Sequence, residues 1–395
     1  MRTLHILAVV CEYNPFHLGH QYQLQQARNL YQPDGIIAIM SGNFTQRGEC
    51  AVVDKYYRTH LALEGGADLV LELPALYATA ASGYFAQGAL LSLAACGVVD
   101  AISFGCENPD SEYLERCAAV LAAEPAEYSA LLRQYLAQGL SYPKAQSLAL
   151  KNLYNLDLPL DNSNDLLGLN YLTAIKRFNL PIKALPILRQ GSHHGGSSAG
   201  FASSSIIRRK IIAGENYLDD VPPFTARLLA QAKTVNMAML EQTLLILLKR
   251  SSPNELLNLP DMTAQLANRL SGAIRQYQST TEILEHLKNK SCTYSRLRRL
   301  LCHLLINITK DDYAYSPAYL RVLGFNHQGQ QILKVMKKQA SLPILTTLSA
   351  ANSLLDSAGR HLLELDLRAA NIYRSFSGEF TANAEYQLFP VMADK

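Results

Sequence analysis

The chain has 395 residues, a formal net charge of +3 and a hydrophobic share of 49%. This length predicts two or three domains, with enough apolar residues for sizeable cores. The small positive charge neither requires nor excludes nucleic acid as a partner. No apolar run is long enough to span a bilayer, and the first residues lead into a predicted strand rather than a signal peptide. We therefore expect no membrane partner.

The cysteine pattern indicates the compartment. Seven cysteines are scattered through the sequence, and no two of them form a CxxC pair. An odd and scattered set is typical of reduced thiols rather than of a disulfide framework. The sequence therefore predicts a cytoplasmic protein.

The most informative stretch lies near the start of the chain. Leu4–Val10 is a short apolar run of the kind that forms a buried strand, and Gln21–Leu30 has its apolar residues on one helical face. Residues 12–20 between them, with the sequence EYNPFHLGH, are therefore predicted to form a strand-to-helix turn. Such a turn presents free backbone N–H groups and the helix dipole to an anion.

Two histidines in this turn match the HxGH signature of the nucleotidylyltransferase superfamily. Attack on the α-phosphate of a nucleoside triphosphate builds negative charge and expels pyrophosphate, and His17 and His20 would stabilise that charge. Gly19 would let the backbone approach the phosphates closely. The alternatives are two histidines that cap a helix by chance, or a zinc pair. No third or fourth ligand stands at metal-site spacing, so we predict no metal site.

Strand and helix patterns alternate through the first half of the chain. Further strands are predicted at Gly35–Met40, Ala67–Pro74 and Val98–Gly105, with helices at Asp54–Leu63 and Ala80–Cys96. Repeated βα units with continuous apolar strands predict an α/β fold with a Rossmann-like parallel sheet covered on both faces. If the strand order is 3-2-1-4, Gly105 lies beside the histidine turn and leaves room for an adenine or a ribose. An ordinary strand-end glycine is the equal alternative.

A second group of candidate residues follows the fifth predicted strand. After a mostly helical stretch, Ile182–Leu188 leads to Arg189, and Pro186 indicates a strand at or near an edge, or a bulge. The Gly-, Ser- and His-rich segment Gln190–Ser205 is predicted to be a mobile loop.

The helix that follows this loop begins in serines. Ser203 and Ser205 can cap it and offer donors to phosphates, while Arg208 adds charge. A capped surface helix is the alternative. With an HxGH turn upstream, we favour triphosphate binding.

The second half of the chain is nearly all helical in its pattern. Val221–Pro223 marks a predicted boundary between domains at residues 1–220 and 221–395. The helical part carries a basic stretch with Tyr294 and His303 interleaved, which suits RNA backbone contacts with some stacking. A solvated helix face is the equal alternative. The basic residues are Lys288, Lys290, Arg296, Arg298, Arg299 and Lys310.

Four further segments make the resemblance more specific than the HxGH signature. Together with residues 12–20, they resemble the bacterial tRNA(Met) cytidine acetate ligase family, from the first strand to about residue 330. The segments are Ser41–Gly48, Asp68–Pro74, Ser103–Gly105 and Tyr319–Asn326.

The resemblance implies an ATP-dependent reaction in two steps. Acetate attacks the α-phosphate of ATP to give acetyl-adenylate and pyrophosphate. The wobble cytidine of elongator tRNA(Met) then accepts the acetyl group and becomes N4-acetylcytidine. Residues 1–220 would be the ATP-binding catalytic domain, and 221–395 would bind tRNA through the basic stretch. Magnesium is the expected companion of ATP.

The resemblance also implies site residues. His17 and His20 would hold the phosphates as the catalytic pair, Asn164 would contact the adenosine side, and Arg189 would contact base, ribose or phosphate. Ser163 and Asp165 flank Asn164 where the family is expected to have proline and asparagine. The implied ATP-binding residues are Val10, Cys11, Glu12, Tyr13, Asn14, Pro15, Phe16, His17, Leu18, Gly19, His20, Gln21, Tyr22, Gln23, Gly105, Asn164 and Arg189.

Three questions stay open at this point. His193 and His194 either join the phosphate site or are a polar loop pair. A small-molecule adenylyltransferase of the HxGH superfamily is the runner-up function, although such an enzyme needs no long helical domain. An RNA-binding protein that uses its nucleotide site only as a switch belongs to a different class.

Overall fold

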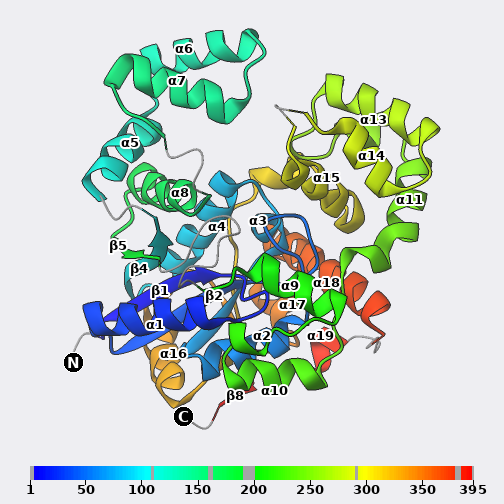
Figure 1. The fold of residues 1–395 in the computed structure, drawn as a ribbon. Coiled ribbons are helices and arrows are strands. Elements are labelled where there is room, and N and C mark those ends of the chain that lie inside the picture. The colour runs from blue at the N-terminus through cyan, green and yellow to red at the C-terminus, as the bar shows by residue number, and fades with distance from the viewer. Residues whose placement is uncertain are drawn as a thin grey trace.

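The computed structural model describes residues 4–107, 111–158, 163–189, 201–289, 292–378 and 384–393. Its centre is one sheet with the strand order β5-β4-β1-β2-β3-β6-β7, and β8 pairs with β6 (Figure 1). The strands are β1 (Ile6–Cys11), β2 (Gly35–Ser41), β3 (Leu69–Leu73), β4 (Val99–Cys106), β5 (Lys183–Leu188), β6 (Leu320–Phe325), β7 (Ile344–Leu345) and β8 (Val391–Met392).

The five strands of the first half are parallel, as their continuous apolar runs predict. The order 3-2-1-4 is confirmed, with β4 beside β1. The expectation that Pro186 stands at an edge is also confirmed, because β5 is the outermost strand next to β4. The strand order reverses between β1 and β4, which is where open α/β sheets bind their ligands.

Both faces of the sheet are covered. Successive strand residues such as Ile36 and Ile37 belong to two different hydrophobic clusters, because their side chains point to opposite faces of the sheet. The covering helices of one face are α1 (Leu18–Tyr31) and α2 (Lys55–Glu64), and those of the other are α3 (Ala75–Ala78), α4 (Ser82–Ala95), α8 (Ser163–Arg177) and α16 (His327–Gln339). The expected two-sided α/β architecture is therefore present.

The end of the chain corrects the predicted division at residue 221. β6 pairs antiparallel with β3, so that Val322 lies opposite Leu71 and Arg321 opposite Glu72. The sheet therefore includes strands from the segment 221–395, which we expected to be helical. The strand could not be recognised in the sequence because it contains the charged Arg321. In the structure Arg321 is only 3% exposed, and buried carboxylates neutralise it.

Two groups of helices stand on either side of α4 and α8 (Figure 1). The first is α5 (Ser111–Ala123), α6 (Ala126–Ala137) and α7 (Tyr142–Tyr154). The second is α11 (Glu241–Arg250), α12 (Pro253–Leu257), α13 (Ala264–Gln276), α14 (Thr280–Leu287) and α15 (Tyr294–Ile306). The hydrophobic core of the second group is continuous with the core on one face of the sheet.

The remaining helices connect these parts. They are α9 (Ser204–Ala213), α10 (Pro223–Gln231), α17 (Ala351–Leu354), α18 (Ser357–Ser377) and α19 (Ala384–Gln387), with short 3-10 turns at Leu218–Asp220, Met237–Leu240 and Asp311–Ala314. Within the described ranges, no helix is both long and apolar enough to cross a membrane.

Candidate active site

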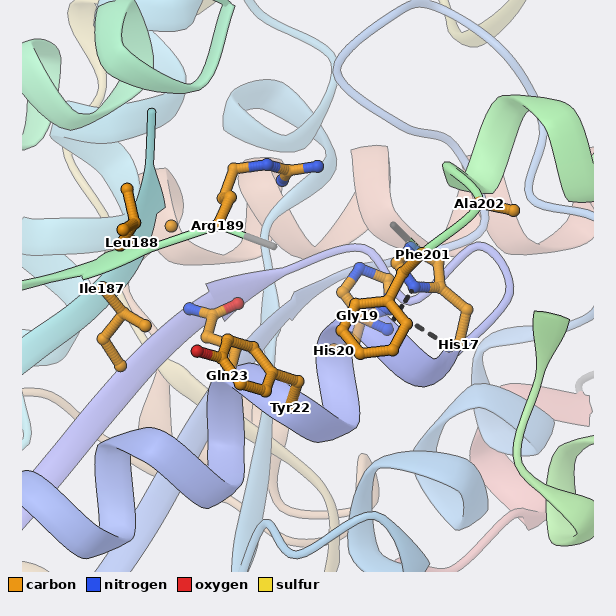
Figure 2. A pocket seen from close by; sticks show the side chains of 11 residues that line it. His17, Gly19, His20, Tyr22, Gln23, Ile187, Leu188, Arg189, Phe201 and Ala202 are labelled. Atoms are coloured by element: carbon orange, nitrogen blue, oxygen red, sulfur yellow. Dashed lines mark hydrogen bonds between the residues drawn. The ribbon is translucent and has the colours of Figure 1, made fainter. Parts of the chain in front are cut away.

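The HxGH turn forms the predicted strand-to-helix connection between β1 and α1. His17 is the N-cap residue of α1, and its Nδ1 accepts the Gly19 amide N–H at 3.0 Å. In return, the Nδ1 of His20 accepts the His17 amide N–H at 3.3 Å. The two histidines thus form a reciprocal capping box, a role for which serine and glutamate are the usual residues. Their rings stack with centroids 3.7 Å apart (Figure 2).

These bonds determine which nitrogen of each ring faces a ligand. A neutral imidazole whose Nδ1 accepts a hydrogen bond carries its proton on Nε2. Burial, with a contribution from Arg189, lowers the pKa of His17 to about 3. Burial, then His17 and Arg189, lowers the pKa of His20 well below its ordinary value. Both rings are therefore neutral donors near pH 7, and their positions are fixed by the backbone of α1.

Buried neutral histidines should make the protein less stable in acid. Burial also lowers the pKa of His303 to about 4, whereas the unfolded chain protonates its histidines near pH 6.5. Because the unfolded state binds more protons below that pH, the free energy of unfolding should be highest above pH 6.5. It should fall on acidification by up to about 1.4 kcal/mol per pH unit for each such histidine.

Chemical denaturation at a series of pH values measures this slope. His303 is buried and its Nε2 donates to the Thr79 carbonyl at 3.0 Å, and a His303→Gln variant keeps a donor there. The slope of this variant between pH 4 and 6.5 should be smaller by about one proton. Equal slopes for the two proteins would contradict the assignment of a neutral His303.

The position of the His17 ring requires a glycine at residue 19. A Cβ on Gly19 would lie 2.9 Å from Cε1 of His17 and 3.6 Å from Cβ of Phe201. The absence of a side chain therefore lets the His17 ring lie against the first turn of α1 and lets Phe201 come close. The approach of a phosphate to the backbone at Gly19 stays a prediction.

A small pocket of about 40 Å³ opens beside the histidines (Figure 2). It brings together predicted site residues from the ends of three strands: Gly105 near the end of β4, Arg189 just after β5, and His17 and His20 in the turn after β1. The predicted proximity of Gly105 to the histidine turn is confirmed. Space at this point is limited by Arg189, since a Cβ on Gly105 would lie 3.1 Å from its Cγ. Tyr22 and Gln23 from α1 complete the wall.

Glu107 is a site residue that the sequence analysis missed. Its Oε1 accepts from Nε of Arg189 at 3.0 Å and from Nδ2 of Asn164 at 3.0 Å. Its own amide N–H donates to Oδ1 of Asp165 at 2.6 Å. Asp165 thus holds Glu107, and Glu107 connects Asn164 to Arg189. The signal was the acidic residue just after the fourth predicted strand.

The segment that leads into α9 lies beside the HxGH turn. Phe201 and Ala202 line the pocket, and Ser203 is the N-cap of α9, with its Oγ 3.0 Å from Oγ of Ser205. The guanidinium of Arg208 donates to the Asn14 carbonyl at 2.8 Å and pairs with Glu49 at 3.2 Å. The structure therefore places Arg208 on the backbone of the HxGH turn, which it supports.

The other residues of the turn divide into lining and support. The Oδ1 of Asn14 accepts the Val52 amide N–H at 2.7 Å, and Oε1 of Glu12 accepts the Gln46 amide N–H at 2.8 Å. The supporting side chains that are buried are Tyr13, Asn14, Pro15 and Phe16, while Val10, Cys11, Glu12, Leu18 and Gln21 are partly exposed.

Arg58 is a second residue that the sequence analysis missed. It is fully buried and donates to the carbonyls of Glu12 at 2.7 Å and Ser41 at 3.0 Å, and also to the Gly42 carbonyl. It thereby fixes the HxGH turn against the loop that follows β2. A buried arginine inside an ordinary helical pattern leaves no sequence signal that distinguishes it from a solvated one.

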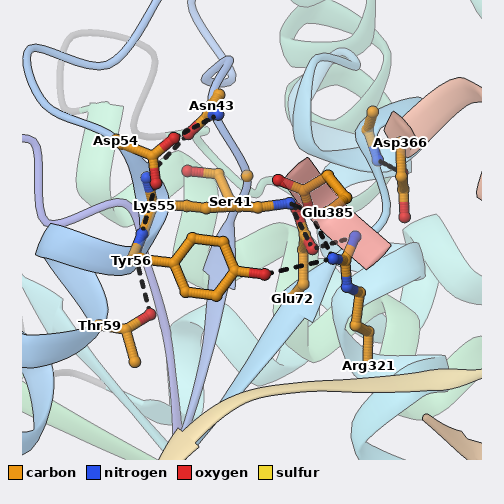
Figure 3. A network of polar contacts seen from close by, with 12 residues as sticks. Ser41, Asn43, Asp54, Lys55, Tyr56, Thr59, Glu72, Arg321, Asp366 and Glu385 are labelled. Carbon is orange, nitrogen blue, oxygen red and sulfur yellow. Dashed lines mark hydrogen bonds and ion pairs between the residues drawn. The ribbon is translucent and has the colours of Figure 1, made fainter. Parts of the chain in front are cut away.

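A buried ionic network lies behind this loop (Figure 3). Nζ of Lys55 lies 2.8 Å from Glu72 and 2.9 Å from Glu385. Arg321 pairs with the same two carboxylates, and Arg374 pairs with Glu385 at 2.8 Å. Burial alone would raise the pKa of Glu385, but the charges of Lys55, Arg321 and Arg374 lower it. The network joins α2, β3, β6, α18 and α19.

The arginines of the predicted basic stretch contact acidic or carbonyl groups, so the stretch is only partly an exposed basic face. Arg298 pairs with Glu49, while Arg299 lies 3.5 Å from the Asp261 carboxylate and Arg296 donates to the Asp261 carbonyl at 2.5 Å. The exposed Lys288 lies over the ring of Tyr294, at 4.7 Å from its centroid.

Other members of the predicted basic stretch differ in their placement. Lys310 is exposed. His303 is fully buried, so its expected place among RNA-stacking residues is wrong. Lys290, His193 and His194 lie outside the described residues.

Comparisons with known proteins find similarity over nearly the whole chain. A family model described as HIGH nucleotidyl transferase matches residues 4–387. The tRNA(Met) cytidine acetate ligase of Clostridium perfringens is 36% identical over 407 residues, covering 98% of this chain and 100% of that protein. Its namesake from a Thermoanaerobacter species is 38% identical over 382 residues, covering 93% and 94%.

Solved structures are similar over the same length. The apo crystal structure of Thermotoga maritima TmcAL superposes with a TM-score of 0.94 at 33% identity, covering 99% of this chain and 100% of that one. A second form of that protein, bound with alpha-thio ATP, gives a TM-score of 0.93 at 33% identity with the same coverage.

Proposed function

The chain belongs to the HIGH nucleotidyl transferase family, and from this premise we propose that it is an ATP-dependent tRNA(Met) cytidine acetate ligase. The observation that carries the proposal is the pair of neutral, stacked histidines that cap α1 beside Arg189. The names of the relatives supply the substrate class, and the ATP analogue bound by the Thermotoga protein supports the nucleotide.

In the first step an acetate oxygen attacks the α-phosphorus of ATP, the bond to the β-phosphate oxygen breaks, and pyrophosphate leaves. Acetate is already ionised at neutral pH, so this step needs no general base. The Nε2–H groups of His17 and His20 donate to the phosphate oxygens, where negative charge increases in the transition state. The dipole of α1, whose N-terminus lies at His17, adds to the same field.

In the second step the exocyclic amine of the wobble cytidine attacks the acetyl carbonyl of acetyl-adenylate. A C–N bond forms, the bond to the adenylate oxygen breaks, AMP leaves, and the amine loses a proton. The amine must come from a single-stranded loop, because a duplex engages it in pairing.

We assign the two ends of ATP to the two sides of the pocket. The phosphates lie by His17 and His20, with Ser203 and Ser205 at the start of α9 as further donors. The adenosine lies by Gly105, with Asn164 and Arg189 held in place through Glu107. The backbone of residues 10–23 forms the floor, and Arg208 supports it through the Asn14 carbonyl.

Magnesium enters this proposal as part of the substrate, as the MgATP complex. Triphosphate chemistry usually holds Mg²⁺ through the phosphates and one or two carboxylates rather than in an all-protein cage. Among the residues that the structure describes, no group of three or more His, Cys, Asp or Glu side chains could form such a cage.

Glu107 gives a specific prediction about nucleotide affinity. A Glu107→Gln variant removes the charge that holds Arg189, while its amide oxygen still accepts from Asn164. We expect the KM for ATP to rise about tenfold, the scale of one charge-assisted hydrogen bond, with a smaller change in kcat. Initial rates at varied ATP measure this. An unchanged KM would remove Glu107 and Arg189 from the nucleotide site.

The acetate-dependent exchange of labelled pyrophosphate into ATP tests the first step alone. The proposal predicts exchange with acetate in the absence of any RNA. Exchange or net turnover only with a phosphorylated small molecule, such as pantetheine phosphate or nicotinamide mononucleotide, would instead establish the small-molecule adenylyltransferase. ATP binding with no turnover on either kind of substrate would favour an RNA-binding protein with a nucleotide switch.

A further inference from the structure

A second and much larger cavity lies between the two groups of helices. Its volume is about 740 Å³, within the range that accommodates substantial organic ligands. One wall comes from α7 and α8 and the other from the start of α15, with the first turn of α4 between them (Figure 1). We call this space the interhelical cleft. The residues that argue for its use are Gln46, Tyr84, Tyr142, Arg177, Arg296 and Arg299.

We propose that the interhelical cleft binds the unpaired anticodon loop of the RNA substrate, with the wobble cytidine at its inner end. This inference rests on the proposed function, which it extends by giving the RNA a binding site. It also replaces the predicted RNA-binding surface, an open basic helix face, with the enclosed interhelical cleft.

The inner end of the cleft adjoins the HxGH turn. Gln46 lines the cleft, and its amide N–H donates to Oε1 of Glu12 at 2.8 Å. Asn170 lines the cleft from α8, the helix whose first turn carries Asn164 of the nucleotide site. A nucleotide seated at this end is therefore close to the groups that hold the adenylate.

Two exposed tyrosines give the cleft surfaces for base stacking. Tyr84 is 44% exposed and Tyr142 is 54% exposed, and both line the cleft. The Tyr84 ring packs against Tyr313 in an edge-to-face arrangement, with ring centroids 4.6 Å apart. Stacking on such rings is how proteins recognise unpaired RNA bases, which present a π-face whatever their sequence.

The arginines of the cleft suit a phosphate backbone. Arg177 on one wall is held by the Leu121 carbonyl at 2.8 Å, while Arg296 and Arg299 on the other wall are held at Asp261. The lining residues thus include three arginines and two carboxylates; Arg177 pairs with Glu124 and Arg299 with Asp261, so one positive charge is in excess. Fixed arginines on both walls and exposed aromatic rings between them favour RNA over an apolar peptide.

Two alanine variants and two controls test this placement. Tyr84→Ala and Tyr142→Ala each remove one stacking surface. Tyr84→Phe keeps that surface, and Tyr386→Ala removes a tyrosine that is 48% exposed on α19 and lies outside the cleft lining. The probe is the anticodon stem–loop of elongator tRNA(Met), with affinity followed by fluorescence anisotropy. Acetate-dependent pyrophosphate exchange is measured in parallel without RNA.

We expect each alanine variant to weaken stem–loop binding between about fivefold and a hundredfold, the range for loss of one base–aromatic stack. Exchange should stay within about twofold of the original protein, and both controls should bind like it. Original affinity in both alanine variants would overturn the inference, and so would loss of exchange with RNA binding intact. Failure of the proposed function is distinguishable, because the unsubstituted protein would then show no acetate-dependent exchange at all.

Discussion

A His17→Asn variant should fold normally and lose about a hundredfold or more of its acetate activation. Asparagine is a good N-cap residue, so its Oδ1 can accept the Gly19 amide N–H that Nδ1 of His17 accepts now. It has no group at the position of Nε2, so the donor to the phosphate is lost. Removal of a preorganised transition-state donor costs about two to three orders of magnitude in kcat.

The same separation of roles applies to His20. Glutamine at the third helical position completes a capping box, so His20→Gln retains the bond from the His17 amide N–H and removes the Nε2 donor. We expect losses of the same size in pyrophosphate exchange, with a thermal unfolding midpoint close to that of the original protein.

Comparison with alanine at either position separates the loss of the phosphate donor from the loss of the helix cap. His17→Ala should lose the cap as well and cost about 1 kcal/mol of stability. If the asparagine and glutamine variants kept their exchange rate within tenfold, the histidines would be helix caps and the account of the phosphate site would fail.

A Lys55→Met variant should lower the free energy of unfolding by about 3–5 kcal/mol, the usual cost of removing one partner from a buried ion pair. The Lys55 ammonium is fully buried between Glu72 and Glu385. Methionine retains the volume of the side chain but leaves these carboxylates with less positive charge. Arg321 and Arg374 remain, so part of the compensation persists.

Urea unfolding measures this loss, and a surface pair supplies the matched control. Lys151 pairs with Asp157 at 2.6 Å, with side chains 45% and 69% exposed. A Lys151→Met variant should change the free energy of unfolding by less than about 1 kcal/mol, because water screens such pairs. Equal effects of the two substitutions would show that the buried network does not hold β6 and α19 on the sheet.

Much of the catalytic half could be predicted from the sequence, because its signals are local. An apolar strand, a turn with two histidines and a helix lie next to one another between residues 4 and 31, so spacing alone gives their geometry. The strand order 3-2-1-4 is only a condition of the prediction; given that order, a ligand binds where it reverses, between the first and fourth strands. The same rule predicted that Gly105 lies beside the histidine turn, and the resemblance implied that Arg189 belongs to the same site.

The parts that could not be predicted depend on pairing between distant charges. Arg321 lies in a strand that looks exposed until Glu72 and Glu385 are placed beside it, from 249 and 64 residues away. Arg298 resembles a free cation in the sequence but pairs with Glu49. His303 lies on the buried side of α15. The sequence alone does not distinguish a charged side chain that is paired in a core from one that is solvated on the surface.

The most direct test of the central claim is to incubate the protein with MgATP, radiolabelled acetate and total bacterial tRNA, and then to locate the label in the RNA. The account predicts ATP-dependent label on one cytidine, at the wobble position of elongator tRNA(Met). It also predicts none with the His17→Asn protein. Pyrophosphate release without labelled RNA would contradict the assignment of tRNA as the acceptor, and an absence of acetate-dependent turnover would contradict the ligase assignment itself.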